Sequence, residues 1–336
     1  TNNLIGVSNY DLGHLFFQAN AGNDNGLAQT PSVCSNNKAG GVTGSAVPVG
    51  DPFVIDYVAH EIGHQFGGSH TFRASTGSCQ GNASNATAYE PGSGSTIMAY
   101  AGICLATNNV QNTSDAYFHA ASVAQMYTVV TKSTDCSVKT ANNNLVPTAD
   151  AGADYTIPKG TAFVLTGTGT DPNNDPLTYL WEQYDNQTST QPPVPTATVG
   201  PIFRSITPSS SPMRYFPKLS SVVLNNLSTQ WEITPTVART LNFSLLVNDN
   251  KATGNQAAND KMVVTVTNDG PFAVTTPNGT LPYSAANPMT VTWNVAGTNT
   301  GSINTQNVSI LLSKDAGLTF NTVLAASVPN TGTAVV

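Results

Sequence analysis

The stretch HEIGHQFGGSH (residues 60–70) holds three of the five histidines in this chain of 336 residues. His60 and His64 are four positions apart, so on a helix their imidazoles project from the same face. That spacing lets two ring nitrogens meet one metal ion at about 2.0–2.1 Å. Gly67 can adopt the positive φ that ends the helix, and the turn then brings His70 round as a third ligand. Three protein ligands with a fourth position open to water are the layout of a catalytic zinc site.

The surroundings of these histidines fit a helix that carries a catalytic base. Asp51 is expected as the N-cap and Pro52 as the first helical residue of DPFVIDYVAHEIGHQF. Glu61 follows the first histidine and is expected to face a bound water instead of the ion. Two histidines at this spacing are by themselves more often a surface pair, and HExxH alone occurs by chance. The full H-E-x-x-H-x-x-G-x-x-H pattern favours the metal site.

A second helix and two strands are expected in the same part of the chain. Residues 122–132 (SVAQMYTVVTK) begin with Ser122 and carry Gln125 three positions later, the pattern of a capping box. Residues 10–18 and 40–49 are expected to form strands. This part of the chain is therefore predicted to be an α+β domain.

Composition narrows the function classes. Charged residues are only 9% of the chain, the net charge is −7, and no Lys/Arg cluster is present. A nucleic-acid partner is therefore not expected. No apolar run approaches the roughly 20 residues that span a bilayer, so no membrane span is expected. The four cysteines, Cys34, Cys79, Cys104 and Cys136, form no CxxC pair. Their even number favours two disulfides and a secreted, extracellular protein, over four free thiols in the cytosol, and three pairings are open.

The chain divides into three parts by composition and hydrophobic pattern. Residues 1–140 contain every histidine and cysteine and both expected helices. Residues 146–268 and 271–336 consist of short alternating apolar runs broken by Pro, Gly, Asn and Asp, as all-β sandwiches do. The segment TANNNLVPTAD (residues 140–150) is expected to be a polar linker. Residues 184–239 are a long insertion, in which SVVLNNL (residues 221–227) is a candidate strand. The expected organisation is one α+β domain followed by two β modules. The last residues, NTGTAVV (residues 330–336), resemble a strand that ends before its partner, so the second module is expected to be incomplete.

The histidine pattern resembles that of the metzincin zinc endopeptidases, whose signature includes a Met-turn downstream. STIMAYAGIC (residues 95–104) supplies such a turn, with Met98 standing 28 residues after His70. YDLGHLF (residues 10–16) and YFHAASVAQM (residues 117–126) resemble a strand and the C-terminal helix of secreted bacterial reprolysin-like proteases. GLAQTPSVCSNNKAGGVTG (residues 26–44) resembles further central strands of that family.

The resemblance implies roles for several residues. Zinc is the implied cofactor, Glu61 the general base and Met98 an apolar floor beneath the histidines. Tyr100 is a candidate for contact with the metal or the transition state, although a packed or substrate-contacting tyrosine is the alternative. Thr71 stands where snake-venom reprolysins carry Asp and astacins carry Glu, and the resulting HTF resembles the pappalysin branch. The family also implies the disulfides Cys79–Cys104 and Cys34–Cys136.

Two binding surfaces follow from the same resemblance. A protein or peptide substrate is expected to add as a strand to the edge formed by Gly26, Leu27, Ala28, Gln29 and Thr30. Only 59 residues precede His60, so the first strands and the backing helix of the family are expected to be missing from this chain. A separate N-terminal fragment of the same protease, which stays associated, is therefore a candidate partner; the alternative is that the chain is truncated.

The β modules add a calcium hypothesis. Both ends of residues 146–268 resemble PKD-like Ig-fold domains, with Trp181 expected in the core, and residues 271–336 are expected to form a further Ig-like module. Candidate calcium ligands are Asp171, Asn173, Asp175 and Asp249, since hard oxygen ligands suit Ca²⁺. The alternative is a polar turn held by Asx hydrogen bonds.

These patterns predict a secreted, bacterial, zinc-dependent endopeptidase with Ig-like accessory modules. The alternative is a surface adhesin in which the metzincin part is a non-catalytic remnant. The intact Glu61 disfavours this alternative, because a non-catalytic remnant has no need for a carboxylate at that position. A zinc amidase or carboxypeptidase is a third hypothesis, which the extended motif and the Met-turn disfavour.

Overall fold

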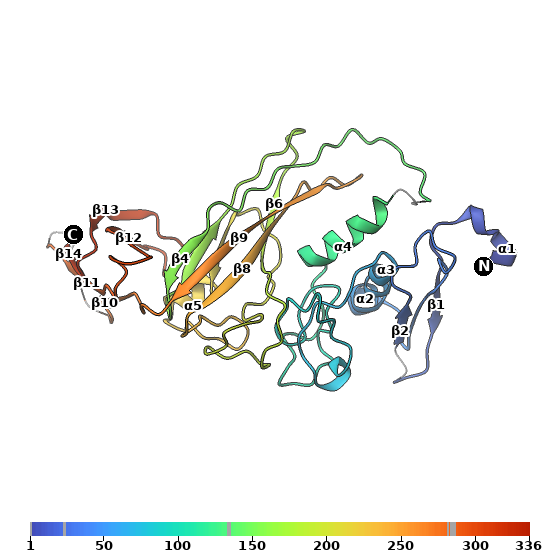
Figure 1. Ribbon diagram of the computed structural model, residues 1–336, viewed down its shortest axis with the longest axis horizontal. Helices are drawn as coiled ribbons and strands as arrows, with labels where there is room; N and C mark the ends of the chain where they lie inside the picture. Colours follow the sequence, from blue (N-terminus) through green and yellow to red (C-terminus); the bar gives the residue numbers. More distant parts are fainter. Residues whose placement is uncertain (1, 23–24, 133–135, 281, 283–286) are drawn as a thin grey trace.

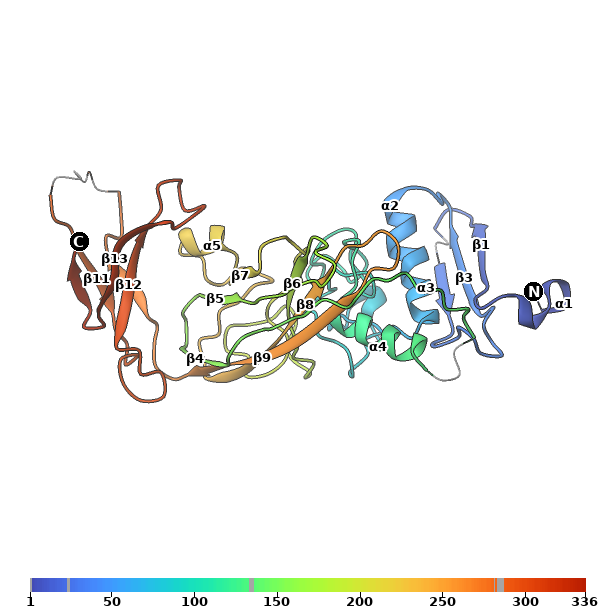
Figure 2. The same ribbon diagram turned by 90° about the horizontal axis from the view of Figure 1, so that it is seen from above.

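The computed structural model describes residues 2–22, 25–132, 136–280, 282 and 287–336. The molecule is elongated, with the N-terminal region at one end, a larger β region in the middle and a small β region at the other end (Figures 1 and 2). Strands dominate and helices are few. The architecture is thus mixed, and most of its helical residues lie in the first part of the chain.

The N-terminal region is built on a three-stranded sheet of order β1-β3-β2. Strand β1 (His14–Gln18) runs parallel to β3 (Gly41–Ser45), and β2 (Asn25–Ala28) pairs antiparallel with β3 and forms an edge. Two short turns precede the sheet, α1 (Asn2–Ile5) and η1 (Val7–Asn9). The strands expected over residues 10–18 and 40–49 are therefore present in shorter form.

The helix that carries the first two histidines is continuous but irregular. It consists of α2 (Gly50–Phe53), the π-helical segment η2 (Val54–Ala59) and α3 (His60–Gln65). Its N-cap is Val49, which makes no side-chain cap, so the expectation that Asp51 caps it is wrong. Asp51 instead lies in the first turn, where a carboxylate favours the helix dipole. Insertions of π-helix are frequent at functional sites.

The second helix, α4 (Ala120–Val130), starts two residues earlier than expected. His119 is the N-cap, and its ring accepts a hydrogen bond from the Ala121 backbone N–H. The expected capping box of Ser122 and Gln125 is therefore wrong, because both residues already lie inside the helix. The Gln125 side chain instead accepts a hydrogen bond from the Ser69 backbone N–H at 3.0 Å.

The central β region (residues 146–268) contains two sheets. The larger one has the order β4-β9-β8-β6 and the smaller one pairs β5 with β7. Their bounds are β4 (Tyr155–Pro158), β5 (Phe163–Thr166), β6 (Thr178–Gln183), β7 (Met213–Phe216), β8 (Arg239–Asn248) and β9 (Ala257–Thr267). Strand β4 is parallel to β9, and the other pairs are antiparallel.

Alternating apolar side chains of these strands fill one core. Members from both sheets include Leu165, Phe216, Trp181, Phe243, Leu245 and Val264. Trp181 is 3% exposed, as expected for a core residue, and its indole N–H donates to the Pro212 carbonyl. Within the long insertion, α5 (Leu219–Val223) replaces the strand expected for SVVLNNL (residues 221–227).

The C-terminal β region (residues 271–336) contains two small sheets. One has the order β10 (Ala273–Thr276), β11 (Thr290–Asn294), β14 (Thr333–Val335), and the other pairs β12 (Asn307–Leu312) with β13 (Thr322–Pro329). The last strand pairs antiparallel with β11, so the expectation that it lacks a partner is wrong.

Replacement of Leu245 by alanine should destabilise the central β region. Leu245 is fully buried in the core, and truncation of such a side chain costs about 2–5 kcal/mol because it leaves a cavity. Urea unfolding followed by tryptophan fluorescence measures the change. Val164→Ala is the control, since Val164 is 41% exposed and its truncation should cost about 0.5 kcal/mol or less. Equal losses for the two variants would contradict the assigned core.

Candidate metal centre

The three histidines of residues 60–70 converge on one point. The Nε2 atom of His70 lies 3.2 Å from Nε2 of His60 and 3.1 Å from Nε2 of His64. His60 and His64 project from α3, and His70 returns to them after the chain turns at Gly67, whose φ is +97°. They are the one group of three or more His, Cys, Asp or Glu residues in the described part of the chain whose ligand atoms all lie within 4.8 Å.

The other nitrogen of each ring, Nδ1, makes a hydrogen bond to a backbone carbonyl. Nδ1 of His60 lies 2.7 Å from the Ile97 oxygen, Nδ1 of His64 2.7 Å from the Gly68 oxygen, and Nδ1 of His70 2.6 Å from the Asn82 oxygen. A carbonyl only accepts, so each Nδ1 carries the proton in the neutral ring. Each Nε2 is therefore an unprotonated lone pair directed toward the other two.

This arrangement fits a zinc ion. Lone pairs 3.1–3.2 Å apart repel one another unless a cation lies between them. Tetrahedral zinc with Zn–N distances of about 2.0–2.1 Å separates its ligand nitrogens by roughly 3.3 Å. Outer hydrogen bonds from Nδ1 to carbonyl groups are also the usual way in which metal-binding imidazoles are oriented.

Burial keeps all three rings in the neutral form that binds metals. Burial is the largest cause that lowers the pKa of each, well below the usual value for His60 and to about 4 for His70. For His60 and His70 the charge of neighbouring histidines lowers the pKa further. The cluster therefore does not need to lose protons at neutral pH before it binds an ion.

Glu61 lies beside this cluster with a free carboxylate oxygen. It is 7% exposed, and its Oε2 is buried without a hydrogen-bond partner among the described residues. Burial raises the pKa of Glu61 to about 7. Strand β2 passes close above it, and a Cβ atom at Gly26 would lie 2.2 Å from Oε1 of Glu61. The glycine thus leaves room for the carboxylate at the edge of the sheet.

Met98 packs beneath the histidine-bearing helix. It is fully buried, and a Cβ atom at Gly63, between the two helical histidines, would lie 2.5 Å from its sulfur. The Met98 carbonyl accepts a hydrogen bond from the Thr71 backbone N–H at 3.1 Å. The turn that contains Met98 is therefore tied to the residue that follows the third histidine.

Glu90 was not among the residues singled out from the sequence, yet it holds this part of the site together. Its carboxylate accepts hydrogen bonds from the hydroxyls of Thr71 (2.5 Å) and Thr96 (2.6 Å) and from the backbone N–H groups of Ser95 and Thr96. Glu90 is 1% exposed. The only sequence signal is an acidic residue in a chain that has few of them.

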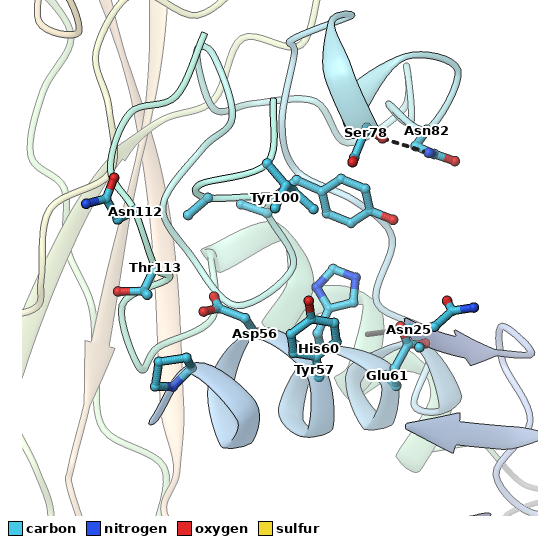
Figure 3. A pocket seen from close by; sticks show the side chains of 15 residues that line it. Asn25, Asp56, Tyr57, His60, Glu61, Ser78, Asn82, Tyr100, Asn112 and Thr113 are labelled. Carbon is cyan, nitrogen blue, oxygen red and sulfur yellow. Dashed lines mark hydrogen bonds between the residues drawn. The ribbon is translucent and has the colours of Figure 1, made fainter. Parts of the chain in front are cut away.

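Tyr100 packs against the ligand rings. Its ring centroid lies 5.5 Å from that of His60 and 4.6 Å from that of His70, and Figure 3 shows it above the His60 ring. Burial, with a smaller effect of the Glu61 charge, raises the pKa of Tyr100 to about 12. The hydroxyl is therefore protonated at neutral pH. These contacts are compatible with both roles expected for Tyr100.

A cavity of about 680 Å³ opens over the site. Asn25 and Gly26 of β2, Asp56 and Tyr57 of η2, His60 and Glu61 of α3 and Tyr100 line it together with residues of nearby loops (Figure 3). Of the expected substrate edge, Gly26, Leu27 and Ala28 lie in β2. Beyond the end of β2, the Gln29 backbone N–H donates one more hydrogen bond to the Gly40 carbonyl, and Thr30 lies outside the strand.

The four cysteines form the disulfides Cys79–Cys104 and Cys34–Cys136. The first connects the loop after His70 with the loop after Met98. The second connects the loop after β2 with the segment that follows α4. Both bonds therefore join segments that surround the metal site.

The candidate calcium residues make the contacts of a polar turn. Oδ1 of Asp171 accepts hydrogen bonds from the backbone N–H groups of Asn173 and Asp175, and Asp175 pairs with the Lys251 ammonium at 2.8 Å. Asp249 accepts a hydrogen bond from the Lys251 backbone N–H. Calcium binding here stays a prediction.

Comparison with known proteins agrees with this geometry. Residues 1–132 match a family described as "Metallo-peptidase family M12B Reprolysin-like". No curated protein sequence matches the chain. A solved structure described as "Structural basis for Dscam isoform specificity" is similar at 12% identity and a TM-score of 0.20, over 58% of this chain and 39% of that one. This chain thus spans well under half the length of that protein, and so weak a likeness carries no argument. The family match and the three-histidine cluster support a zinc metallopeptidase.

Proposed function

We propose that this chain is a secreted zinc endopeptidase that cleaves proteins or peptides. One observation carries the proposal: the unprotonated Nε2 atoms of His60 and His64 lie 3.1–3.2 Å from that of His70, and a buried, unpartnered carboxylate oxygen of Glu61 lies beside them. The reprolysin-like match over residues 1–132 supports the same reaction class. We assign the metzincin subtype from the extended histidine motif and Met98.

His60, His64 and His70 would hold the zinc ion. Bound zinc supplies a Lewis acid that lowers the pKa of water and polarises a peptide carbonyl. Glu61 takes the proton from the attacking water at its free Oε2 and later returns it to the leaving amine. A pKa of about 7 suits both transfers, because a carboxyl group with that value accepts and releases protons near neutral pH. The chain then needs no serine or cysteine nucleophile.

Strand β2 is the proposed substrate-binding edge. It pairs with β3 on one side only, and its residues Asn25 and Gly26 line the cavity over the site. An extended peptide added to this edge would pass directly over Glu61. Because the edge is open, it would accept the interior of a chain, which favours an endopeptidase over a carboxypeptidase or an amidase.

The remaining expectations concern location and partners. The two disulfides fit an extracellular protein, and we propose secretion from a bacterium. Among the described residues, no helix combines the length and the apolar character that a bilayer crossing requires. We also propose PKD- or Ig-like folds for the two β regions, since each contains two sheets and every strand pair except β4–β9 is antiparallel.

A separate N-terminal fragment is the proposed partner of the N-terminal region. Strand β1 is an edge of its sheet and carries large exposed apolar side chains: Leu15 (63%), Phe16 (52%) and Phe17 (42%). Exposed apolar side chains on a sheet edge are typical of a surface that another segment covers.

Replacement of Glu61 by glutamine should abolish peptide hydrolysis and leave zinc bound. The amide has nearly the same shape but cannot take a proton, so the rate should fall by about 10²–10⁴-fold. Hydrolysis of a quenched fluorescent peptide gives the rate, and elemental analysis gives the zinc content. An active Glu61→Gln variant would remove Glu61 from the mechanism.

A zinc chelator should reduce hydrolysis to background, and added zinc should restore it, since the rings alone do not polarise the substrate. The same chelator saturated with zinc beforehand is the control. Hydrolysis that survives removal of the metal would contradict the zinc mechanism. Zinc-loaded protein that hydrolyses no peptide would favour a non-catalytic remnant, as in an adhesin.

Intact-mass measurement of active material, purified without denaturant, should detect a second polypeptide beside this chain, because the exposed β1 edge is expected to be covered. Full activity in material that contains this chain alone would contradict the proposed partner.

A further inference from the structure

The polypeptide between the histidine-bearing helix and α4 has little regular structure of its own. Over residues 66–119, all of which the structure describes, the only helix is the short 3₁₀ turn η3 (Gly77–Cys79) and there is no strand. This segment, here called the site loop, carries the third histidine and Met98. Its backbone groups must therefore find hydrogen-bond partners outside helices and sheets.

The central β region contacts the first half of the site loop through side chains. Arg73, only three residues after His70, donates to the Asn186 carbonyl and to the Thr188 hydroxyl. The Asn186 side chain donates in turn to the Ala86 carbonyl at 2.9 Å. Arg73 is 6% exposed, so its guanidinium is enclosed between the two regions.

A second contact holds the backbone beside Arg73. The Gly92 N–H donates to the side-chain oxygen of Gln191 at 2.7 Å, and the Gly92 carbonyl accepts from the N–H groups of Arg73 and Ala74. A Cβ atom at Gly92 would lie 2.5 Å from the ring of Trp231. The central β region thus packs directly on the backbone that pairs with the segment after His70.

The turn around Met98 is supported from the same side. The Ile97 carbonyl orients His60, and the Ile97 N–H donates to the Tyr117 carbonyl. The Tyr117 hydroxyl donates to Ser205 at 2.8 Å, and the Ser205 carbonyl accepts from the Ser95 hydroxyl at 3.4 Å. Ser205 lies in the long insertion of the central β region and is 3% exposed.

A third contact fixes α4. The Glu182 carboxylate, on β6, accepts hydrogen bonds from the Ala120 N–H at 2.7 Å and from the Ser205 hydroxyl, and it lies 3.6 Å from the His119 ring. Glu182 therefore caps the first turn of α4 from another region of the chain. The Gln125 side chain of α4 then holds the backbone of Ser69, the neighbour of His70.

We propose that the central β region is an integral part of the metal centre and not an independent accessory module. Its residues 182–231 hold the site loop and α4 in the positions that present His70 and orient His60. This inference rests on the proposed zinc site. It implies that zinc binding and folding of the central β region are thermodynamically coupled, since a ligand stabilises every part that must be folded for it to bind.

The tryptophans provide a selective probe of this coupling. The chain contains three, Trp181, Trp231 and Trp293, and none lies in the N-terminal region. In a Trp293→Phe background, fluorescence reports the central β region alone. Zinc binding itself is measured separately by competition with a chromophoric chelator.

Zinc at 100 times its dissociation constant should lower the unfolding equilibrium constant reported by Trp181 and Trp231 by about 100-fold relative to metal-free protein. Urea unfolding of the full chain gives this constant. An identical tryptophan transition with and without zinc, in protein that binds zinc, would overturn the inference and leave the proposed function intact. Wild-type protein that binds no zinc would overturn both.

Contact variants test the same coupling from the other side. Arg73→Met combined with Gln191→Ala should weaken zinc binding by about 10–100-fold, as loss of outer hydrogen bonds does in other metal sites. Lys314→Met is the matched control, because it removes a cation from an exposed turn of the C-terminal β region and should leave the affinity unchanged. Unchanged affinity in the double variant, with a tryptophan transition at the wild-type position, would also overturn the inference.

Discussion

Repulsion between three imidazole lone pairs is the constraint on which the rest of this structure depends. Three backbone carbonyls hold the protons on Nδ1, so the Nε2 atoms that face one another have none to share. Protonation of a ring would relieve this repulsion, but burial disfavours it because burial lowers the pKa of each ring. Such a cluster is stable only around a cation, and the nitrogen separations suit zinc.

Holding the three rings in this position needs more than the helix. The carbonyls that orient His60 and His70 belong to Ile97 and Asn82, both in a segment almost without helices or strands. Glu90 and the Cys79–Cys104 disulfide connect parts of that segment to each other. Partners from the central β region supply the remaining support. The catalytic chemistry therefore depends on contacts between residues far apart in the sequence.

The candidate metal site is predictable from the sequence because its main determinants are local. The spacing of His60, His64 and His70 follows from the period of one helix and the turn at Gly67, and the structure brings these rings together. Alternation in the β regions likewise predicted strands. The start of α4 was predicted wrongly: its N-cap is His119, and Glu182, more than 60 residues away, accepts a further hydrogen bond from its first turn, which no local pattern reveals. Glu90 was missed for a similar reason, since its role arises only after the chain folds back on Thr71 and Thr96.

X-ray absorption at the zinc edge, on the assembled protein after removal of loosely bound metal, tests the central claim most directly. We expect one zinc per chain with three imidazole nitrogens at about 2.0–2.1 Å and a water oxygen in the fourth position. A metal-free protein, or a spectrum with sulfur ligands or fewer than three imidazoles, would contradict it.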